Sequence, residues 1–318
     1  MNDHLASTSP PTPKPISQPS YFMIWWKTIR PATLWAGASP VLVGAGIGVH
    51  SQIQWGKQQF LTLLLALIGA LLIQIACNLV NDYSDFEKGT DDENRLGPAR
   101  AAAQGWLSSK QLKKGAVLSL SLAALCGVYL TWVGGWPILA LGLASLLSAV
   151  AYTAGPFPLA YLGLGDLFVL LFFGFGAVGG TAWLLCAESL PSETWVAGAA
   201  VGALATAILV VNNLRDRHGD AQNQKNTLAV RFGASFARWE YTVLVFGALA
   251  ANLYVAWLIK SWAWLCPLVL LPLAWRRVRQ IWRLDGRDLN PLLGQTAQLE
   301  LLYCFSLTSG LLLESWLN

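Results

Sequence analysis

Two acidic clusters hold the residue types in this sequence that are best suited to chemistry. The first, NDYSDFEKGTD, contains Asn81, Asp82 and Asp85, and the second, NNLRDRHGD, contains Asp216 and Asp220. In both clusters the polar side chains recur every three or four residues, which places them on one face of a helix. Carboxylate and amide oxygens suit a hard divalent cation, and Mg²⁺ is commonly held by carboxylates together with substrate phosphates. The spacing therefore predicts two facing Mg²⁺-binding helix ends.

The surroundings of the two clusters are alike. An amide, Asn78 or Asn212, lies one turn before the carboxylates, and basic residues follow in each case: Lys88, Arg95 and Arg100 after the first cluster, and Lys225 after the second. Carboxylates sharing a cavity repel by about 4 kcal/mol per pair at 4 Å and an effective dielectric of 20, so cations must offset them. This pairing of acids and cations predicts a metal-bound anionic ligand and indicates a pseudo-repeat within the chain. The acidic stretch 87–93, taken alone, is typical of a solvated loop.

The elements that must position these residues are membrane helices. The chain is 55% hydrophobic and only 12% charged, whereas a soluble domain has about 25% charged residues. This composition excludes an ordinary soluble enzyme. A transmembrane helix needs about 20 apolar residues. Nine segments are candidates: 31–50, 60–81, 115–133, 137–154, 165–186, 194–213, 240–259, 261–275 and 298–317.

The basic residues predict how the nine segments are oriented. Of the 21 Lys and Arg residues, only Lys57 and Lys260 fall on the side opposite to the others. By the positive-inside rule the N-terminus and both acidic clusters are then cytoplasmic and the C-terminus is outside. Residues 1–20, with five prolines and no apolar run, are predicted to be a disordered tail. They lack the apolar stretch of a signal peptide.

Other residues are better explained by structure than by chemistry. The five cysteines lie far apart in apolar runs without a CxxC pair, which is typical of small core residues. The stretch GFGAVGG at 174–180 indicates close helix packing, because a dinucleotide site would need a preceding strand. Serine and histidine offer no catalytic triad.

Four stretches together resemble a known family. The two acidic motifs, with RLGPAR after the first and QNQKNTL after the second, are similar to the two Asp-rich motifs of UbiA-type intramembrane prenyltransferases. YTAGPFPLAYLGLGDLFVLLFFG (152–174) and DLNPLLGQTAQ (288–298) resemble the branch that prenylates 1,4-dihydroxy-2-naphthoate in menaquinone synthesis. The resemblance runs over about residues 25–318.

The resemblance implies an all-α bundle of about nine transmembrane helices around a central cavity, in a single domain spanning 21–318. It also implies roles for individual residues. Metal ligands for Mg²⁺ would be Asn81, Asp82, Asp85, Asp216 and Asp220. Asp85, Asp216 and Lys225 would be the catalytic residues, while Asn81, Arg95, Arg100 and Asn212 would bind substrate.

Two positions depart from the family pattern. Gly89 stands where the family commonly has another aspartate, and Asp91, two residues later, is a possible substitute. Gln224 stands where glycine commonly precedes the motif lysine, which puts the local backbone geometry in question.

A lone carboxylate, Asp166 in GLGDLF, precedes the fifth segment on the same side as the motifs. It suits a helix N-cap, where aspartate is favoured. It equally suits the wall of an acceptor pocket, together with Tyr152 and Tyr161.

The expected function follows from the branch resembled. It is transfer of a polyprenyl group from polyprenyl diphosphate to 1,4-dihydroxy-2-naphthoate, with loss of CO₂ and diphosphate, giving demethylmenaquinol. The expected setting is the cell inner membrane, with a lipid bilayer around the protein, no nucleic acid and no obligatory protein partner. Alternatives are phytyl transfer to the same acceptor, a different aromatic acceptor such as 4-hydroxybenzoate, and, outside the enzymes, a cation-coupled transporter using the intramembrane acids.

Overall fold

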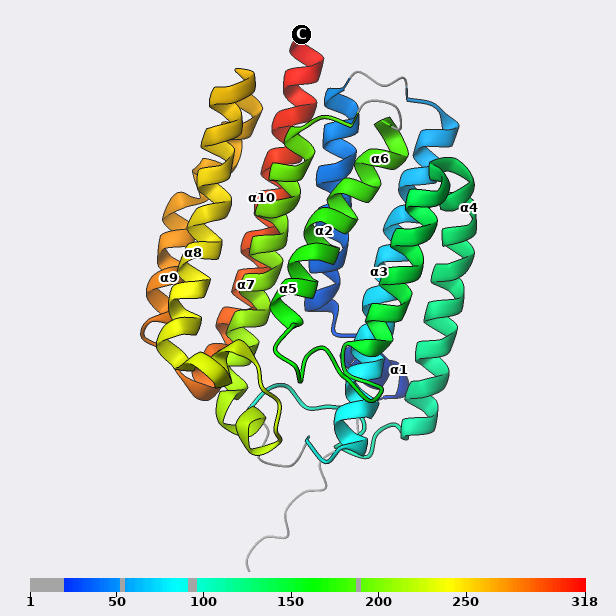
Figure 1. Ribbon diagram of the computed structural model, residues 1–318, viewed down its shortest axis with the longest axis vertical. Coiled ribbons are helices and arrows are strands. Elements are labelled where there is room, and N and C mark those ends of the chain that lie inside the picture. Colours follow the sequence, from blue (N-terminus) through cyan, green and yellow to red (C-terminus); the bar gives the residue numbers. More distant parts are fainter. Residues whose placement is uncertain (1–19, 52–54, 91–95, 187–189) are drawn as a thin grey trace, which may run out of the picture.

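A computed structural model of the chain describes residues 20–51, 55–90, 96–186 and 190–318, and every regular element in these ranges is a helix. The expected disordered tail lies outside the described residues except for Ser20, and so do Asp91 and Arg95. The helices form one upright bundle, with the C-terminus at its upper end in Figure 1. The predicted all-α architecture is confirmed.

The helices in chain order are α1 (Tyr21–Thr28), α2 (Pro31–His50), α3 (Lys57–Glu87), α4 (Ser109–Ala151), α5 (Gly165–Val169), η1 (Leu170–Gly179), α6 (Gly180–Cys186), α7 (Glu193–Gln222), α8 (Leu228–Ile259), η2 (Trp262–Leu270), α9 (Leu271–Ile281), η3 (Gly286–Leu289) and α10 (Asn290–Leu317). Of these, η1 is a π-helix that continues α5 into α6, and η2 and η3 are 3₁₀-helices.

The nine apolar segments correspond to nine helical passes. Seven stretches of the described chain are long and apolar enough to cross a membrane as single helices. One of them, α4, folds back on itself at Gly135, which has a φ of 70° and is therefore outside the right-handed helical region. The two arms of α4 run side by side in Figure 1. These arms account for two predicted segments. The predicted segment 261–275 is shared between η2 and α9, each too short to be counted as a span on its own.

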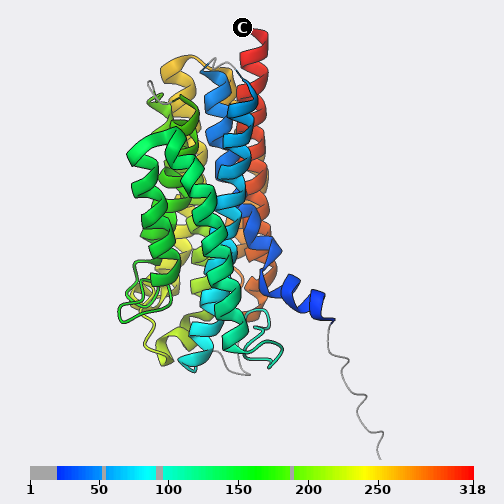
Figure 2. The same cartoon turned by 90° about the vertical axis from the view of Figure 1, so that its right-hand side faces the viewer.

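The surface of the bundle suits lipid. Large apolar side chains are exposed along the outer helices, and Trp132 and Trp136 near the fold in α4 are 76% and 78% exposed. Such apolar exposure would be a liability in water but is expected for a bilayer-facing surface. Helix α1 is inclined to the upright bundle and projects from its lower end in Figure 2, while its Ile24 packs in a core cluster with Leu79 and Leu112. Its exposed Tyr21 and Phe22 suit a helix that lies in the interface.

The centre of the bundle is built from small residues. Helix α7 is rich in alanine and glycine, is largely buried, and contacts η1, α8, α10 and α2. A Cβ atom at Gly174 of η1 would lie 2.3 Å from the carbonyl oxygen of Gly198 in α7, so only glycine permits this approach. The prediction of close helix packing in 174–180 is confirmed.

The helices of the two acidic motifs continue beyond their apolar parts. Helix α3 continues to Glu87 and α7 to Gln222, so both acidic clusters are still helical. Both helices finish at the lower end of the bundle in Figure 1. This end of the bundle is called the motif end below.

Candidate active site

Helix α3 ends immediately after the first acidic cluster, in a Schellman motif. Gly89 adopts a φ of 72°, its N–H bonds the Phe86 carbonyl at 3.0 Å, and the Thr90 N–H bonds the Asp85 carbonyl at 2.9 Å. This pattern terminates a helix through a left-handed residue, most often glycine. The departure at Gly89 is thereby explained, because this position closes the helix.

Helix α7 ends in the same way after the second cluster. Gln224 has a φ of 55°, its N–H bonds the Ala221 carbonyl at 3.3 Å, and the Lys225 N–H bonds the Asp220 carbonyl at 2.8 Å. Asp220 therefore occupies the position in α7 that Asp85 occupies in α3. Gln224 therefore adopts the left-handed conformation that glycine takes readily, at the cost of strain.

The equivalent ends have an electrostatic consequence. The C-terminal end of a helix carries roughly half a negative charge from its unpaired carbonyl groups. Asp85 and Asp220 add full negative charges at these ends. The ends of α3 and α7 therefore attract cations. An anionic substrate can approach them only if positively charged groups lie between the substrate and the two helix ends.

Asp85 is held by two donors from distant parts of the chain. Arg100 Nη2 lies 3.1 Å from one carboxylate oxygen, and the Tyr161 hydroxyl donates to the other at 3.2 Å. Asp85, Arg100 and Tyr161 therefore lie in contact at the motif end, although Tyr161 belongs to the loop between α4 and α5. Burial, and then the negative charge of Asp85, raise the pKa of the Tyr161 hydroxyl above its ordinary value, so Tyr161 remains a donor to Asp85.

The other polar residues of the first cluster divide into two groups. Asn81 lines the central cavity, and its side-chain oxygen accepts a hydrogen bond from the Thr153 hydroxyl. Asn78 also borders the cavity but donates to the Ile29 carbonyl at 3.0 Å, and so fixes the turn between α1 and α2. Asp82 is only 1% exposed, and its two oxygens accept the backbone N–H groups of Ala101 and Ala102 at 3.1 Å each.

This arrangement gives Asp82 a position different from that of the other predicted metal ligands. It does not belong to the described residues that line the cavity. Its carboxylate anchors the loop that begins at Arg100, and so fixes the arginine that reaches Asp85.

The second cluster is organised by a residue that the sequence reasoning missed. Arg215, 1% exposed, binds both oxygens of Asp216 at 2.8 and 2.6 Å and the side-chain oxygen of Asn212 at 2.7 Å. It also donates to Asn290 at the start of α10, at 3.0 Å. The one signal in the sequence was an arginine directly before a motif aspartate.

Asp220 and Lys225 form a looser pair. The Lys225 ammonium lies 3.4 Å from one Asp220 oxygen, and the other oxygen is buried without a hydrogen-bond partner among the described residues. Lys225 lines the cavity, and its ammonium lies 6.0 Å from the centre of the Tyr161 ring.

Lys88 reaches the same loop from the end of α3. Its ammonium donates to the Thr153 carbonyl at 2.5 Å and lies 4.3 Å from the centre of the Tyr161 ring. Burial lowers the pKa of Lys88; Asp85 opposes that shift and Lys225 adds to it. The loop 152–164 therefore connects the two motifs, because Tyr161 contacts Asp85 and is flanked by both lysines.

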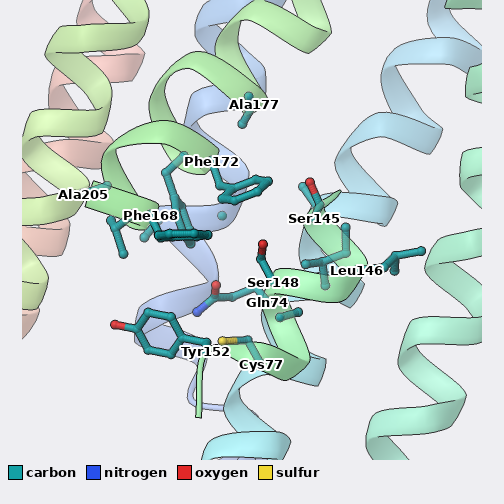
Figure 3. Close-up of a pocket in the computed structure, with 18 of the residues that line it drawn as sticks. Gln74, Cys77, Ser145, Leu146, Ser148, Tyr152, Phe168, Phe172, Ala177 and Ala205 are labelled. Carbon is teal, nitrogen blue, oxygen red and sulfur yellow. The ribbon is translucent and has the colours of Figure 1, made fainter. Parts of the chain in front are cut away.

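A central cavity of about 710 Å³ opens between α2, α3, α4, α5–η1 and α7, and its wall is mostly apolar. Part of it is shown in Figure 3. Its volume lies within the range of ligand pockets. Seven predicted site residues line it: Asn81, Asp85, Arg100, Tyr152, Asp166, Asn212 and Lys225. Asp216 and Asp220 are linked to this lining: Asp220 pairs with Lys225, and Asp216 binds Arg215, which also binds Asn212.

Asp166 stands in the first turn of α5, while the N-cap position belongs to Leu164. One Asp166 carboxylate oxygen is buried with no hydrogen-bond partner in the described chain. Tyr152 stands at the end of α4, and its hydroxyl lies against the start of α5, since a Cβ atom at Gly165 would be 2.9 Å from it. Both residues border the cavity, as expected for a pocket wall, and Asp166 is not the N-cap.

The sequence profile of the UbiA prenyltransferase family matches residues 38–293. The chain is 36% identical to the 1,4-dihydroxy-2-naphthoate octaprenyltransferase of Escherichia coli, covering 92% of this chain and 96% of that one. The protein of the same name from Haemophilus influenzae is 34% identical, with 91% and 96% covered. That of Mycobacterium tuberculosis is 36% identical, with 91% and 97% covered.

Solved structures of the same fold include a UbiA homolog from Archaeoglobus fulgidus bound to DMAPP and Mg²⁺. The TM-score is 0.62 at 15% identity, covering 90% of this chain and 99% of that one. A UbiA homolog from Aeropyrum pernix without ligand gives a TM-score of 0.64 at 15% identity, with 87% and 97% covered. At this level of identity the comparison establishes the fold.

Proposed function

The chain belongs to the UbiA prenyltransferase family, and from that premise we propose that it transfers a polyprenyl group to 1,4-dihydroxy-2-naphthoate. The by-products are diphosphate and CO₂, and the product is demethylmenaquinol. The main support is the similarity, over about nine-tenths of the chain, to enzymes named for this activity. The meeting of both Asp-ended helices with Arg100 and Lys225 at one apolar cavity supports it further.

The residues at the motif end fit a magnesium–diphosphate site. Asn81, Asp85, Asp216 and Asp220 provide oxygen donors only, and one Asp220 oxygen is buried without a partner in the described chain. Within the described residues, no three His, Cys, Asp or Glu side chains form a metal cluster. Mg²⁺ commonly takes one or two carboxylates and completes its shell with substrate phosphates and water. We propose that Asp82 does not bind the metal and instead holds the loop that begins at Arg100 in place.

The chain's own residues supply most of the chemistry. Arg100 and Lys225 donate charge-assisted hydrogen bonds to the diphosphate, with Asn81 and Asn212 beside them at the cavity wall. Arg95 belongs to the same expected set and lies outside the described residues. When bound, Mg²⁺ would neutralise diphosphate charge and so stabilise the leaving group.

The bond changes balance without an external oxidant. The allylic C–O bond breaks, and its electron pair leaves with diphosphate. The ring carbon that carries the carboxylate forms the new C–C bond, and loss of CO₂ returns its bonding pair to the ring and restores aromaticity. The apolar wall of the cavity keeps water away from the allylic cation.

The membrane setting follows from the substrates, because a polyprenyl donor and its product both reside in lipid. We place the protein in the cell inner membrane with the motif end in the cytoplasm, on the basis of the charge distribution. The 4-hydroxybenzoate and phytyl alternatives differ in substrate alone, so they are decided by assay. We do not retain the transporter alternative, because the chain belongs to a family of prenyltransferases.

The proposal is tested with the full-length chain reconstituted in lipid nanodiscs. The assay supplies octaprenyl or phytyl diphosphate, Mg²⁺, and either 1,4-dihydroxy-2-naphthoate or 4-hydroxybenzoate, and products are identified by mass spectrometry. We expect demethylmenaquinol from the naphthoate and the octaprenyl donor, with release of CO₂, and no turnover after chelation with EDTA until Mg²⁺ is restored. Preference for 4-hydroxybenzoate, or turnover in excess EDTA, would contradict the proposal.

A further inference from the structure

One polar side chain inside the cavity has no function so far. Gln74 lies on α3 seven residues before Asn81, which is about 10 Å deeper along the helix. Because seven residues make two helical turns, Gln74, Asn78 and Asn81 lie on the same side of α3, and all three line the cavity. Gln74 is thus placed beyond the diphosphate-binding end, toward the apolar interior.

Gln74 is half-buried, and its amide faces the cavity without a hydrogen bond to any residue that the structure describes. Helix α2 crosses it closely, since a Cβ atom at Gly37 would lie only 3.3 Å from the Gln74 Cβ. An amide in an apolar environment is unfavourable unless it is hydrogen-bonded. Leucine or methionine would fill this position on an apolar helix without that cost, so the amide indicates a polar ligand.

The surroundings of Gln74 are shaped for a flat ring. Phe168 and Phe172 project from α5 and η1 into the cavity, with ring centres 6.0 Å apart and planes inclined by 30°. In the view of Figure 3 the Gln74 amide lies between the rings of Phe168 and Tyr152, with the hydroxyl of Ser148 nearby. Aromatic faces and a few fixed polar groups are the usual lining of a site for an aromatic ligand.

We propose that the Gln74 amide binds and orients the aromatic acceptor by hydrogen-bonding its ring hydroxyl or carboxylate. This inference rests on the proposed function. An amide offers both a donor and an acceptor, so one side chain can fix the ring's rotation within its plane. The position suits the reaction, because the ring must lie next to the first carbon of the prenyl chain, just beyond the diphosphate. Gln74 is a positioning residue, and it undergoes no covalent change.

The test exchanges Gln74 for methionine, which has nearly the same length and removes only the amide. For Gln74→Met we expect kcat/KM for 1,4-dihydroxy-2-naphthoate to fall about 10- to 100-fold, the range for losing a hydrogen bond to a buried or charged group. The KM for octaprenyl diphosphate and the thermal melting temperature should stay unchanged. Ser145→Ala is the matched control, because the Ser145 hydroxyl lines the same wall but already bonds the Leu141 carbonyl at 2.8 Å.

Acceptor analogues make the test specific. With 1-hydroxy-2-naphthoate, which lacks the 4-hydroxyl, and with 1,4-dihydroxynaphthalene, which lacks the carboxylate, binding to the wild-type protein and to Gln74→Met is measured by competition. The affinity difference between the two proteins should disappear for 1-hydroxy-2-naphthoate if the amide binds the 4-hydroxyl, and for 1,4-dihydroxynaphthalene if it binds the carboxylate. It should persist for both analogues if the amide binds the 1-hydroxyl. An unchanged kcat/KM for the naphthoate in Gln74→Met, or an equal loss of donor affinity, would overturn the inference. Failure of the wild-type protein to use the naphthoate at all would instead overturn the proposed function.

Discussion

At the scale of single residues, each carboxylate that the mechanism needs has its own cation. Asp85 pairs with Arg100, Asp216 with Arg215, and Asp220 with Lys225. The mutual repulsion of acids sharing one end of the bundle is therefore compensated within the protein. The pairs differ in strength, because Arg215 is bidentate and fully buried, whereas Lys225 is 3.4 Å from one oxygen of Asp220.

This difference makes Asp220 the most informative carboxylate to change. In Asp85→Asn or Asp216→Asn, a buried arginine would lose its counter-charge, and the fold would be weakened together with the activity. For Asp220→Asn we expect prenyl transfer to fall about 100-fold, as for other preorganised electrostatic groups. The melting temperature should change little, because the Lys225 contact is long, at 3.4 Å, and the other Asp220 oxygen has no partner among the described residues.

The matched control is Glu87→Gln, at the last residue of α3. Glu87 is exposed and pairs with Lys113 at 2.7 Å, and exposed pairs contribute little. Its turnover should stay within twofold of the wild type. If Asp220→Asn retained near-normal turnover, the assignment of Asp220 to the magnesium–diphosphate site would be wrong.

The site residues were predictable from the sequence only where their spacing matched the repeat of a helix. Helical periodicity located Asn81, Asp85 and Asp220. It did not separate Asp85 from Asp82, since both fit the same periodicity, and their roles diverge through contacts with Arg100 and with the Ala101 and Ala102 amides. Arg215 links Asn212 and Asp216 to Asn290, which is 75 residues away, and no local pattern reports this long-range contact.

At the scale of elements, the ends of α3 and α7 matter more than their interiors. Both helices close through a left-handed residue four positions after a motif aspartate. In α3 this residue is glycine, which adopts the conformation readily, and in α7 it is glutamine, which does not. The second motif therefore keeps its geometry despite local strain.

Replacing the strained residue should stabilise the protein. For Gln224→Gly we expect the free energy of unfolding to rise by about 0.5–1 kcal/mol, because the left-handed conformation no longer opposes a Cβ atom. The melting temperature in detergent should rise by about 1–3 °C. The reciprocal exchange Gly89→Gln is the control and should lower it by a similar amount. A decrease in Gln224→Gly would show that the glutamine side chain stabilises the turn by contacts of its own.

The elements themselves were largely predictable, because a helix that crosses a bilayer must be apolar along its length. The predicted segments 31–50 and 165–186 coincide with α2 and with the α5–η1–α6 helix. The apolar segments 60–81 and 194–213 stop before the ends of α3 and α7, since hydropathy falls where the aspartates begin. The periodicity of the acidic residues correctly predicted that both clusters are helical. The π-helical form of η1 was not foreseen, because hydropathy does not distinguish a π-helix from an α-helix.

At the scale of the whole molecule, both motifs lie at the end of the bundle opposite the C-terminus (Figure 1). The positive-inside rule assigns this end to the cytoplasm. Trp136, just after the fold in α4, lies at the opposite end and is 78% exposed. The exposed Lys110 begins the same helix at the motif end.

Cysteine labelling tests this orientation. In a background in which the five native cysteines are replaced by alanine or serine, single variants Lys110→Cys and Trp136→Cys are treated with a membrane-impermeant maleimide in spheroplasts. Trp136→Cys should react in intact spheroplasts, and Lys110→Cys only after the membrane is permeabilised. The reverse pattern would show that the motif end faces outward.

The paired helix ends also determine which sequence changes the site can tolerate. One residue added or removed between Asp220 and Gln224 would turn the carboxylate by about 100° around the axis of α7 relative to the turn that closes it. The same holds between Asp85 and Gly89. We therefore expect insertions and deletions to be excluded from these two five-residue windows in functional variants of this chain, even where substitutions within them, such as glutamine at position 224, are accepted.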